Sequence, residues 1–439
     1  MSEAQWSGRA LHFIAIGGAG MSGLAAVCHG LGASVTGSDR ADSSYLRRLR
    51  RAGLEPWVGH DAERVPAGAE VIVSTAIADD NPELRRARER GQRVIHRGEL
   101  LAELCALKRL IAVSGTHGKT TTSGMLAHAL RATGADSAFI LGGELPGAGA
   151  EGGPANAGWG AGEWVVAEAD ESDGSFLQLR PEVAVVTNVE LDHHSRWSSR
   201  AELFDAFRRF VEPASGVALG AGPELEPLAA AARVARFDLD SPGPPLRLGV
   251  PGRHNVLNAR AALAASELAE LDPVAVARAL ESFPGMVRRL ERKGEAAGAV
   301  IYDDYAHHPT EVAAALEALR ELEPRRLIAV FQPHLYSRTK ALAGRFGSAL
   351  AGADVIGVLD VYAARELPVG PLAGVSGLDV ARAAADRAGG RAVWWLRDLV
   401  TAESVLGPRL RPGDLLVTIG AGDVVHLGEA LVEDGQAGR

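Results

Sequence analysis

The sequence SGTHGKTTT at residues 114–122 joins a short apolar run to a helical pattern through two glycines and a histidine. The residues before it, 108–113, read as a buried strand, and apolar residues recur at helical spacing over 125–130. A strand, a glycine turn and a helix starting at Lys-Thr form a phosphate-binding loop, in which backbone N–H groups face the anion and Lys119 adds a positive charge. Val113 stands where the strict pattern requires its first glycine, so the loop alone predicts a phosphate site without identifying the nucleotide or the reaction.

The bulk composition is that of an ordinary globular protein. A chain of 439 residues is long enough for about three domains of ~150 residues each. The net charge of −9, with acidic residues scattered along the chain, disfavours nucleic acid or an anionic membrane as the main partner. Cys28 and Cys105 are the only cysteines, so we expect neither a disulfide framework nor a cysteine-rich zinc site. No stretch of about 18 apolar residues occurs, and we expect a cytoplasmic protein.

Apolar runs that read as strands alternate with helical patterns along the chain. This alternation predicts an α/β protein built on mostly parallel sheets with helices on both faces. Three such units follow one another, with linkers near residues 105–108 and 281–285. The predicted domains cover residues 1–106, 107–282 and 283–439.

A second glycine loop, GGAGMSG at residues 17–23, follows the N-terminal strand. Gly18, Gly20 and Gly23 fit the pattern G-x-G-x-x-G, and Asp39 ends the next strand about 20 residues further on. Taken alone, this fingerprint supports a nicotinamide-dependent dehydrogenase. The motif requires only a pyrophosphate beside a nucleoside, which UDP also presents, and a tight turn that merely packs a helix on a strand would look the same.

Four acidic residues directly follow another predicted strand, in the order Glu168-Ala-Asp170-Glu171-Ser-Asp173. In a parallel sheet this acidic loop lies at the same edge as the phosphate loop, and its mutual repulsion would be costly to bury without a cation. We therefore expect it to bind magnesium rather than to be a solvated loop. The next strand ends in TNVELDHH at residues 187–194, which adds a polar cluster at the same edge.

Three later clusters also carry donors and acceptors. Asn255 and Asn258 in GRHNVLNA lie one turn apart at a helix start and suit a purine edge, although a helix cap with an exposed amide would look the same. DDYAHHP at residues 303–309 ends one strand, and QPHLYSRT at 332–339 ends the next. Arg338 in the second of these offers a guanidinium fork that suits a small carboxylate.

Together, and in chain order, these segments resemble the Mur ligases of peptidoglycan synthesis over nearly the whole chain. The motifs that carry the resemblance are GGAGMSG, GTHGKTTT, EADESDGSF, TNVELDH, GRHNVLNA, RRLE, DDYAHHPTE, QPHLYSRT, DVYAARE and GAGDV. The phosphate loop with His117 resembles that of the alanine-adding branch of the family. The resemblance implies a Rossmann-like UDP-sugar domain, a central ATP-binding domain and a Rossmann-like amino-acid domain, in that order.

The resemblance implies an ATP-dependent ligase that joins L-alanine to the lactyl carboxylate of UDP-N-acetylmuramate through an acyl phosphate. It overrides the dehydrogenase hypothesis, and a nucleotide-gated switch would not need the clusters at 303–309 and 332–339. A recycling ligase that adds a tripeptide to UDP-N-acetylmuramate shares many of these motifs and is the alternative. We expect ATP and Mg²⁺ as cofactors, UDP-N-acetylmuramate and L-alanine as partners, and a monomer or homodimer.

The resemblance also implies roles for individual residues. The UDP substrate would contact Gly18, Gly20, Met21, Ser22, Gly23, Asp39 and Ser74. ATP would contact Gly115, Thr116, His117, Gly118, Lys119, Thr120, Thr121, Asn255, Asn258 and, at the ribose, Asp304. The metal would be held by Thr120, Glu168 and His193, and the amino acid by Tyr305, His307 and Arg338. The implied catalytic residues are Lys119, His193 and Arg338.

The choice of metal-binding acid depends on position along the acidic loop. Glu168 ends the strand and should face Thr120, so it is favoured over Glu171. Asp173 should lie further along the loop, where solvent screens it.

Some positions depart from the family pattern. Leu335 stands where some relatives carry a second arginine, so the carboxylate of the amino acid would depend on Arg338 alone. The stretch 211–252 is shorter than expected, which affects the periphery of the central domain. The order LDHH leaves a separate role open for His194.

Overall fold

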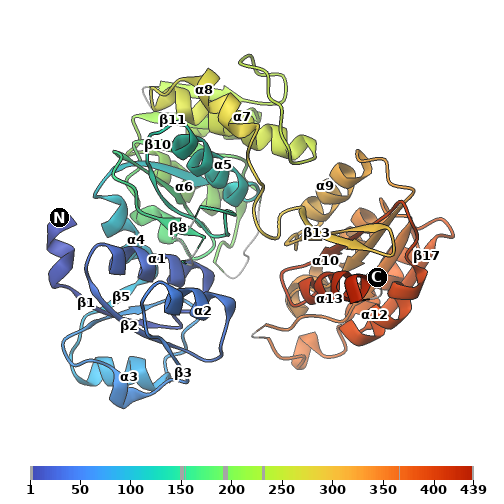
Figure 1. Ribbon diagram of the computed structural model, residues 1–439, viewed down its shortest axis with the longest axis horizontal. Helices are drawn as coiled ribbons and strands as arrows, with labels where there is room; N and C mark the ends of the chain where they lie inside the picture. Colours follow the sequence, from blue (N-terminus) through green and yellow to red (C-terminus); the bar gives the residue numbers. More distant parts are fainter. Residues whose placement is uncertain are drawn as a thin grey trace. The chain divides into compact units, whose positions relative to one another are not determined.

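The computed structural model describes residues 3–148, 153, 155–190, 196–229, 233–364 and 366–437. Contacts divide the chain into two compact units, one of Met1–Gly249 and Val256–Pro284, the other of Val250–Asn255 and Gly285–Arg439. The first unit contains two sheets and the second contains one (Figure 1). The prediction of three mostly parallel sheets is confirmed, whereas the exact domain boundaries stay predictions.

The first sheet has five parallel strands in the order β3-β2-β1-β4-β5 (blue in Figure 1). Its strands are β1 (Ala10–Ile14), β2 (Ser34–Asp39), β3 (Trp57–Val58), β4 (Glu70–Val73) and β5 (Val94–His96). Its helices are α1 (Ala19–Gly30), α2 (Ser44–Arg51), α3 (Pro82–Glu89) and α4 (Arg97–Cys105), with 3-10 turns η1 (Glu3–Gly8) and η2 (Ala62–Arg64). The strand order reverses between β1 and β4. The glycine loop after β1 therefore lies at a switch point, where ligands bind in doubly wound sheets.

The second sheet has seven strands in the order β12-β11-β10-β6-β9-β7-β8, and only β8 is antiparallel to its neighbour. Its strands are β6 (Arg109–Ser114), β7 (Ala138–Ile140), β8 (Ala157–Gly158), β9 (Trp164–Glu168), β10 (Val183–Val186), β11 (Gly216–Gly220) and β12 (Arg233–Phe237). Its helices are α5 (Lys119–Ala132), α6 (Arg200–Val211), α7 (Arg253–Leu268) and α8 (Pro273–Leu280), with 3-10 turns η3 (Ser175–Gln178) and η4 (Pro223–Leu228). Because β6 lies between β9 and β10, the segments that follow these three strands meet at one edge of the sheet.

The third sheet has six strands in the order β13-β14-β18-β15-β16-β17, and only β13 runs antiparallel. Its strands are β13 (Glu291–Ala296), β14 (Ala299–Asp304), β15 (Arg326–Phe331), β16 (Val355–Leu359), β17 (Ala392–Arg397) and β18 (Asp414–Ile419). Its helices are α9 (Pro309–Arg320), α10 (Tyr336–Leu350), α11 (Gly377–Ala385), α12 (Leu399–Leu406) and α13 (Val425–Ala437), with 3-10 turns η5 (Gly370–Leu372) and η6 (Gly407–Arg409). The last strand of the chain, β18, is inserted between β14 and β15.

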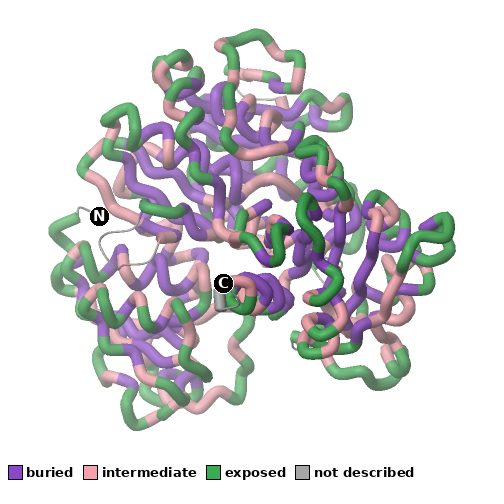
Figure 2. Tube along the Cα trace, turned by 45° about the vertical axis from the view of Figure 1, so that its right-hand side comes forward, coloured by how far each residue is buried: buried purple, intermediate pink, exposed green. Residues whose placement is uncertain are grey.

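Buried residues follow the strands within each sheet, and exposed residues gather on loops and outer helix faces (Figure 2). Strands β10 and β18 are buried along their whole length, since helices cover both faces of a parallel sheet. This explains why these strands read as continuous apolar runs rather than alternating patterns. No helix in the described part of the chain is long and apolar enough to cross a membrane.

Candidate active site

The phosphate loop has the local structure that its sequence predicts. Gly115 has φ 131° and Gly118 has φ 83°, in the left-handed region that favours glycine. A Cβ at Gly115 would overlap Thr187 Oγ1, and one at Gly118 would lie 2.5 Å from Asn258 Oδ1. Helix α5 begins at Lys119 directly after Gly118, which has no side chain to cap it. The N–H groups of its first turn are thus available to an anion such as a nucleotide phosphate.

The segment after β10 fixes the phosphate loop from one side. The backbone N–H of Thr116 donates to Asn188 O at 3.1 Å, and that of His117 donates to Asn188 Oδ1 at 2.9 Å. Thr187 Oγ1 donates to His117 O at 2.6 Å, and Thr116 Oγ1 donates to Glu190 O at 2.9 Å. The cluster that was expected to add ligands therefore has a structural role as well. His193 and His194 lie outside the described residues.

The side chain of Lys119 is 12% exposed and is surrounded by oxygen atoms. Its Nζ lies 2.9 Å from Glu171 Oε2 and donates to Gly115 O at 2.5 Å and Thr116 O at 3.2 Å. Burial alone would lower the pKa of Lys119, but the carboxylates of the acidic loop, Glu171 first among them, outweigh it and raise that pKa. Lys119 is thus held as a cation at the position where phosphate oxygens would approach the loop.

Glu168 faces Thr120, as predicted. Its Oε1 accepts from Thr120 Oγ1 at 3.0 Å, and its Oε2 accepts from Gly142 N at 2.9 Å. A hydroxyl and a carboxylate oxygen at this spacing, beside a phosphate loop, form a donor set that suits Mg²⁺. The residues present therefore fit the expected metal.

The expectation that solvent screens Asp173 is wrong. Its side chain is only 7% exposed, and its Oδ2 accepts from Arg97 Nη2 at 2.9 Å. Its Oδ1 accepts from Ser175 N at 2.9 Å, so the carboxylate also shapes the turn into η3. The partner Arg97 starts α4 in the first sheet, 76 residues earlier, and no local pattern around Asp173 indicates it.

The first glycine loop is braced by its predicted acid and by the second sheet. Asp39 Oδ2 accepts from Gly17 N at 2.9 Å. Asn156, just before β8, donates its side-chain amide to Ala19 O, and a Cβ at Gly23 would lie 3.0 Å from Ala157 Cβ. Packing therefore accounts for Gly23, and the UDP contacts expected for this loop remain a prediction.

The remaining residues of the predicted UDP set occupy the same edge of the first sheet. Met21 and Ser22 are buried in the first turn of α1, and Ser22 Oγ donates to Ala19 O at 3.1 Å. Ser74 directly follows β4 and accepts through its backbone oxygen from Ile77 N at 3.1 Å.

Asn255 and Asn258 lie one turn apart on α7, as predicted. Asn258 Oδ1 accepts from Thr122 Oγ1 at 3.3 Å, which places this amide against the helix of the phosphate loop. Asn255 Nδ2 donates to Pro251 O at 2.7 Å and closes the turn before the helix. Their contact with a purine remains a prediction.

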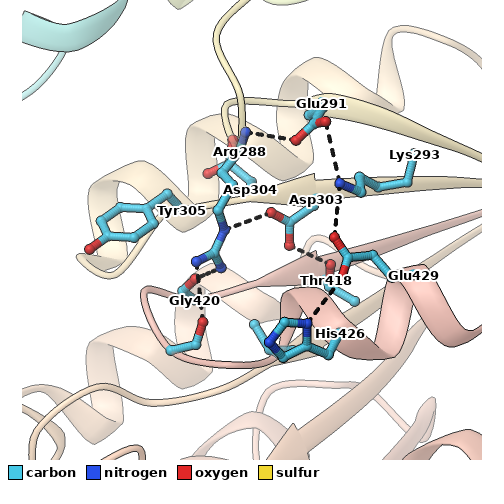
Figure 3. A network of polar contacts seen from close by, with 12 residues as sticks. Arg288, Glu291, Lys293, Asp303, Asp304, Tyr305, Thr418, Gly420, His426 and Glu429 are labelled. Carbon is cyan, nitrogen blue, oxygen red and sulfur yellow. Dashed lines mark hydrogen bonds and ion pairs between the residues drawn. The ribbon is translucent and has the colours of Figure 1, made fainter. Parts of the chain in front are cut away.

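In the second unit, Arg288 of the motif RRLE holds two strand ends together (Figure 3). Its Nε donates to Asp303 Oδ2 at 2.9 Å, and its Nη2 donates to Gly420 O at 2.7 Å. Thr418 Oγ1 donates to Asp303 Oδ1 at 2.6 Å. Lys293 continues the network, 3.3 Å from a carboxylate oxygen of Glu429. The sequence marks RRLE as a motif but does not reveal this bracing role.

Asp304, the predicted ribose ligand, is buried and accepts from two backbone groups. Its Oδ2 accepts from Leu290 N at 2.7 Å and its Oδ1 from Ala306 N at 2.8 Å. Burial raises the pKa of Asp304 to about 6, against the opposing effect of Arg289. The carboxylate therefore fixes the loops around it, and each oxygen keeps a lone pair for a further donor.

The residues predicted to bind the amino acid are brought together in the second unit. The rings of Tyr305 and His307 lie 5.5 Å apart, and those of His307 and His334 lie 6.2 Å apart. Arg338 Nη1 lies 3.5 Å from His334 Nδ1, and the ring of His334 stacks on Tyr362 at 5.9 Å. His334 and Tyr362 belong to the quoted motifs QPHLYSRT and DVYAARE but were not assigned to the site.

Two features shape this amino-acid cluster further. Burial lowers the pKa of His307, which therefore favours the neutral ring. Leu335 has φ 68° and ψ 133°, a strained conformation for a side-chain-bearing residue, directly before α10. This residue is held there because its N–H donates to Tyr362 O at 3.0 Å and its carbonyl accepts from Thr339 N at 3.0 Å.

The raised pKa of Asp304 gives a testable pH dependence. Because the folded protein binds this proton more tightly than the unfolded chain, the carboxyl group contributes stability that is complete below about pH 4 and is lost as the pH rises through about 6. The shift from 3.8 to about 6 corresponds to about 3 kcal/mol. We expect denaturant unfolding of wild type and Asp304→Asn between pH 4 and 7.5 to show this loss. As the pH rises, the free energy of unfolding of the variant should increase relative to wild type by up to about 3 kcal/mol, and the difference should be constant above about pH 6. A pH-independent difference would contradict the assignment.

Sequence models of one family match consecutive parts of the chain. They are described as Mur ligase family, catalytic domain, over residues 10–109, Mur ligase middle domain over 113–220, and Mur ligase, glutamate ligase domain, over 288–422. Together they span both compact units.

Individual proteins are similar over nearly the full length. The UDP-N-acetylmuramate–L-alanine ligase of Kineococcus radiotolerans is 46% identical over 95% of this chain and 94% of its own. The protein of the same name in Rubrobacter xylanophilus is 43% identical over 96% of this chain and 99% of its own. Among solved structures, the UDP-N-acetylmuramate–alanine ligase MurC of Thermotoga maritima matches with a TM-score of 0.83 and 28% identity, covering 98% of this chain and 99% of that one.

Proposed function

Because the chain belongs to the Mur ligase family, we propose that it joins L-alanine to the lactyl carboxylate of UDP-N-acetylmuramate in a reaction driven by ATP. The observation that carries the proposal is the acidic loop at residues 168–173, which contacts the phosphate loop at one end and reaches the first glycine loop through Arg97 at the other. A dehydrogenase would need the first glycine loop but neither the phosphate loop nor the acidic loop. The curated relatives described above are named for alanine addition, so tripeptide addition is not favoured.

The chemistry requires activation, because a carboxylate is a poor electrophile. A lactyl carboxylate oxygen attacks the γ-phosphorus of ATP, the bond to the bridging oxygen breaks, and ADP leaves. The amine nitrogen of alanine then attacks the acyl carbon, the carbon–oxygen bond to the phosphoryl group breaks, and inorganic phosphate and a proton are released. Charge develops on the transferred group in the first step, where a fixed cation lowers the barrier.

Lys119 and the acidic loop are the residues that meet this charge. Lys119 would exchange its contacts with Glu171 and the loop carbonyls for phosphate oxygens of ATP. Thr120 and Glu168 would hold Mg²⁺, which when bound neutralises negative charge on those oxygens. The resemblance adds His193 as a further metal ligand.

Residues of the second unit would bind the amino-acid substrate. Arg338 carries a permanent positive charge and a planar fork that matches a carboxylate. Tyr305 and His307 border the same cluster, and neutral His307 would not repel the ammonium group of alanine. With leucine at position 335, Arg338 is the arginine of QPHLYSRT that can pair with the carboxylate.

A coupled assay tests the function directly. The purified chain should release inorganic phosphate from ATP when UDP-N-acetylmuramate and an amino acid are both present, fastest with L-alanine, and mass spectrometry should show one alanine residue added. Activity with a tripeptide but not with alanine would indicate the recycling ligase. Oxidation of NADH would indicate a dehydrogenase, and phosphate release with ATP alone would indicate a switch.

The metal assignment is tested by comparing two glutamates of the acidic loop. Glu168→Gln keeps the size of this side chain and one acceptor oxygen for Gly142 N but removes the charge that Mg²⁺ requires. Ligation should collapse at ordinary magnesium concentrations and recover partly when magnesium is raised. Glu171→Gln is the matched comparison, and a magnesium response confined to that variant would transfer the metal to Glu171. If neither variant responds, the acidic loop does not bind the metal.

The role of Arg338 is tested by the dependence of the rate on alanine. A charge-assisted hydrogen bond is worth roughly 1.5–3 kcal/mol, so Arg338→Ala should raise the Michaelis constant for alanine by about ten- to a hundredfold. The Michaelis constant for ATP should change little. Arg345→Ala is the control, because Arg345 is an exposed arginine on the same helix α10. An unchanged alanine dependence in Arg338→Ala would transfer carboxylate binding to another group.

A further inference from the structure

Arg97 lies between the first glycine loop and the acidic loop. It is the first residue of α4, and its side chain is 22% exposed. Its Nη2 donates to Asp173 Oδ2 at 2.9 Å and lies 3.5 Å from Asp170 Oδ2. Its Nη1 lies 3.2 Å from the point that a Cβ on Gly20 would occupy. One edge of the guanidinium thus faces the acidic loop while the other faces the glycine loop.

The acidic edge holds the guanidinium in a fixed orientation. Asp173 is itself fixed, since its Oδ1 accepts from Ser175 N at 2.9 Å. Helix α4 packs closely against the same turn, where a Cβ at Gly98 would overlap Ser175 Cβ. The neighbouring His96 caps α4 by accepting from Gly98 N at 3.2 Å. Arg97 is therefore oriented by its surroundings before any ligand binds.

The other edge is open to an anion. Within the described residues, Nη1 of Arg97 has no hydrogen-bond partner. It lies beside the glycines that open α1, where the backbone allows close approach and the helix start favours negative charge. An arginine fork matches the oxygen geometry of a phosphate, and it keeps its charge at any physiological pH.

We propose that Arg97 binds the diphosphate of the UDP substrate, and that Asp173 is the positioning residue that orients it. The inference rests on the proposed function, because it takes a nucleoside diphosphate as the ligand of the first glycine loop. The acidic loop then serves both nucleotides, with Glu168 facing the phosphate loop and Asp173 holding the arginine of the other site.

Calorimetry with two probes tests this role. UDP and uridine differ only in the diphosphate, so Arg97→Ala should weaken UDP binding by about ten- to a hundredfold and leave uridine binding unchanged. Arg97→Lys should fall in between, because lysine keeps the charge but loses the fork. Arg93→Ala is the matched control, an exposed arginine directly before β5 whose ion pairs with Glu70, Glu99 and Glu103 lie outside the site.

Asp173→Asn separates positioning from direct binding. It should weaken UDP binding less than Arg97→Ala does, and the double variant should bind UDP no more weakly than Arg97→Ala alone, because Asp173 acts through Arg97. Additive losses would contradict the positioning role.

The remaining outcomes decide the proposal. Unchanged UDP affinity in a folded Arg97→Ala variant would overturn it. So would a loss confined to ATP-analogue binding, which would show that Arg97 only braces the acidic loop. If Arg97→Ala fails to fold, Arg97→Gln, which keeps an amide towards Asp173, decides by the same comparison. Failure of the wild type to bind UDP would instead refute the proposed function.

Discussion

The site depends on the clustering of several carboxylates at the end of a single strand. Glu168, Asp170 and Glu171 follow one another at the end of β9, and crowding such charges, with Glu171 fully buried, is unfavourable unless each meets a cation or a donor. Thr120 donates to the first and Lys119 pairs with the third, and both partners belong to the first turn of α5. The phosphate loop and the acidic loop therefore fix each other's geometry.

The second unit meets the same constraint with different partners, and the pKa values of its strand-end acids are raised rather than lowered. Partial burial would raise the pKa of Asp170, but the positive charge of Lys119 outweighs it and lowers that pKa. Asp304 is also buried, but its direct partners are two backbone N–H groups, so desolvation prevails and its pKa rises to about 6. The pKa of Asp303 is raised as well, because burial outweighs the charge of Arg288, so desolvation dominates at both buried acids that end β14.

The sequence predicts those features of the site that depend on residues close in sequence or on one sheet edge. The glycine turns, the helix start at Lys119 and the approach of Glu168 to Thr120 all follow from residues close in sequence or at one sheet edge. The strand order does not follow, because β18 enters the centre of the third sheet from the far end of the chain. The same reason makes the prediction for Asp173 wrong, since its partner Arg97 begins helix α4, which packs on the first sheet. Likewise, Arg288 donates to the carbonyl of Gly420, which lies 132 residues further along the chain.

The contact between the two sheets of the first unit passes through the first glycine loop. Asn156 donates to Ala19 O at the start of α1, Gly23 packs on Ala157, and Ile140 and Ala157 join the apolar core of the first sheet. The antiparallel pair β7–β8 of the second sheet therefore packs against the first glycine loop, where the pyrophosphate is expected. Since the acidic loop links the same two sheets through Arg97, the separation of the first glycine loop and the phosphate loop is set by packing inside one compact unit. In the proposed reaction, transfer of the γ-phosphoryl group of ATP to the lactyl carboxylate would thus depend on the reach of UDP-N-acetylmuramate from the first glycine loop to the phosphate loop.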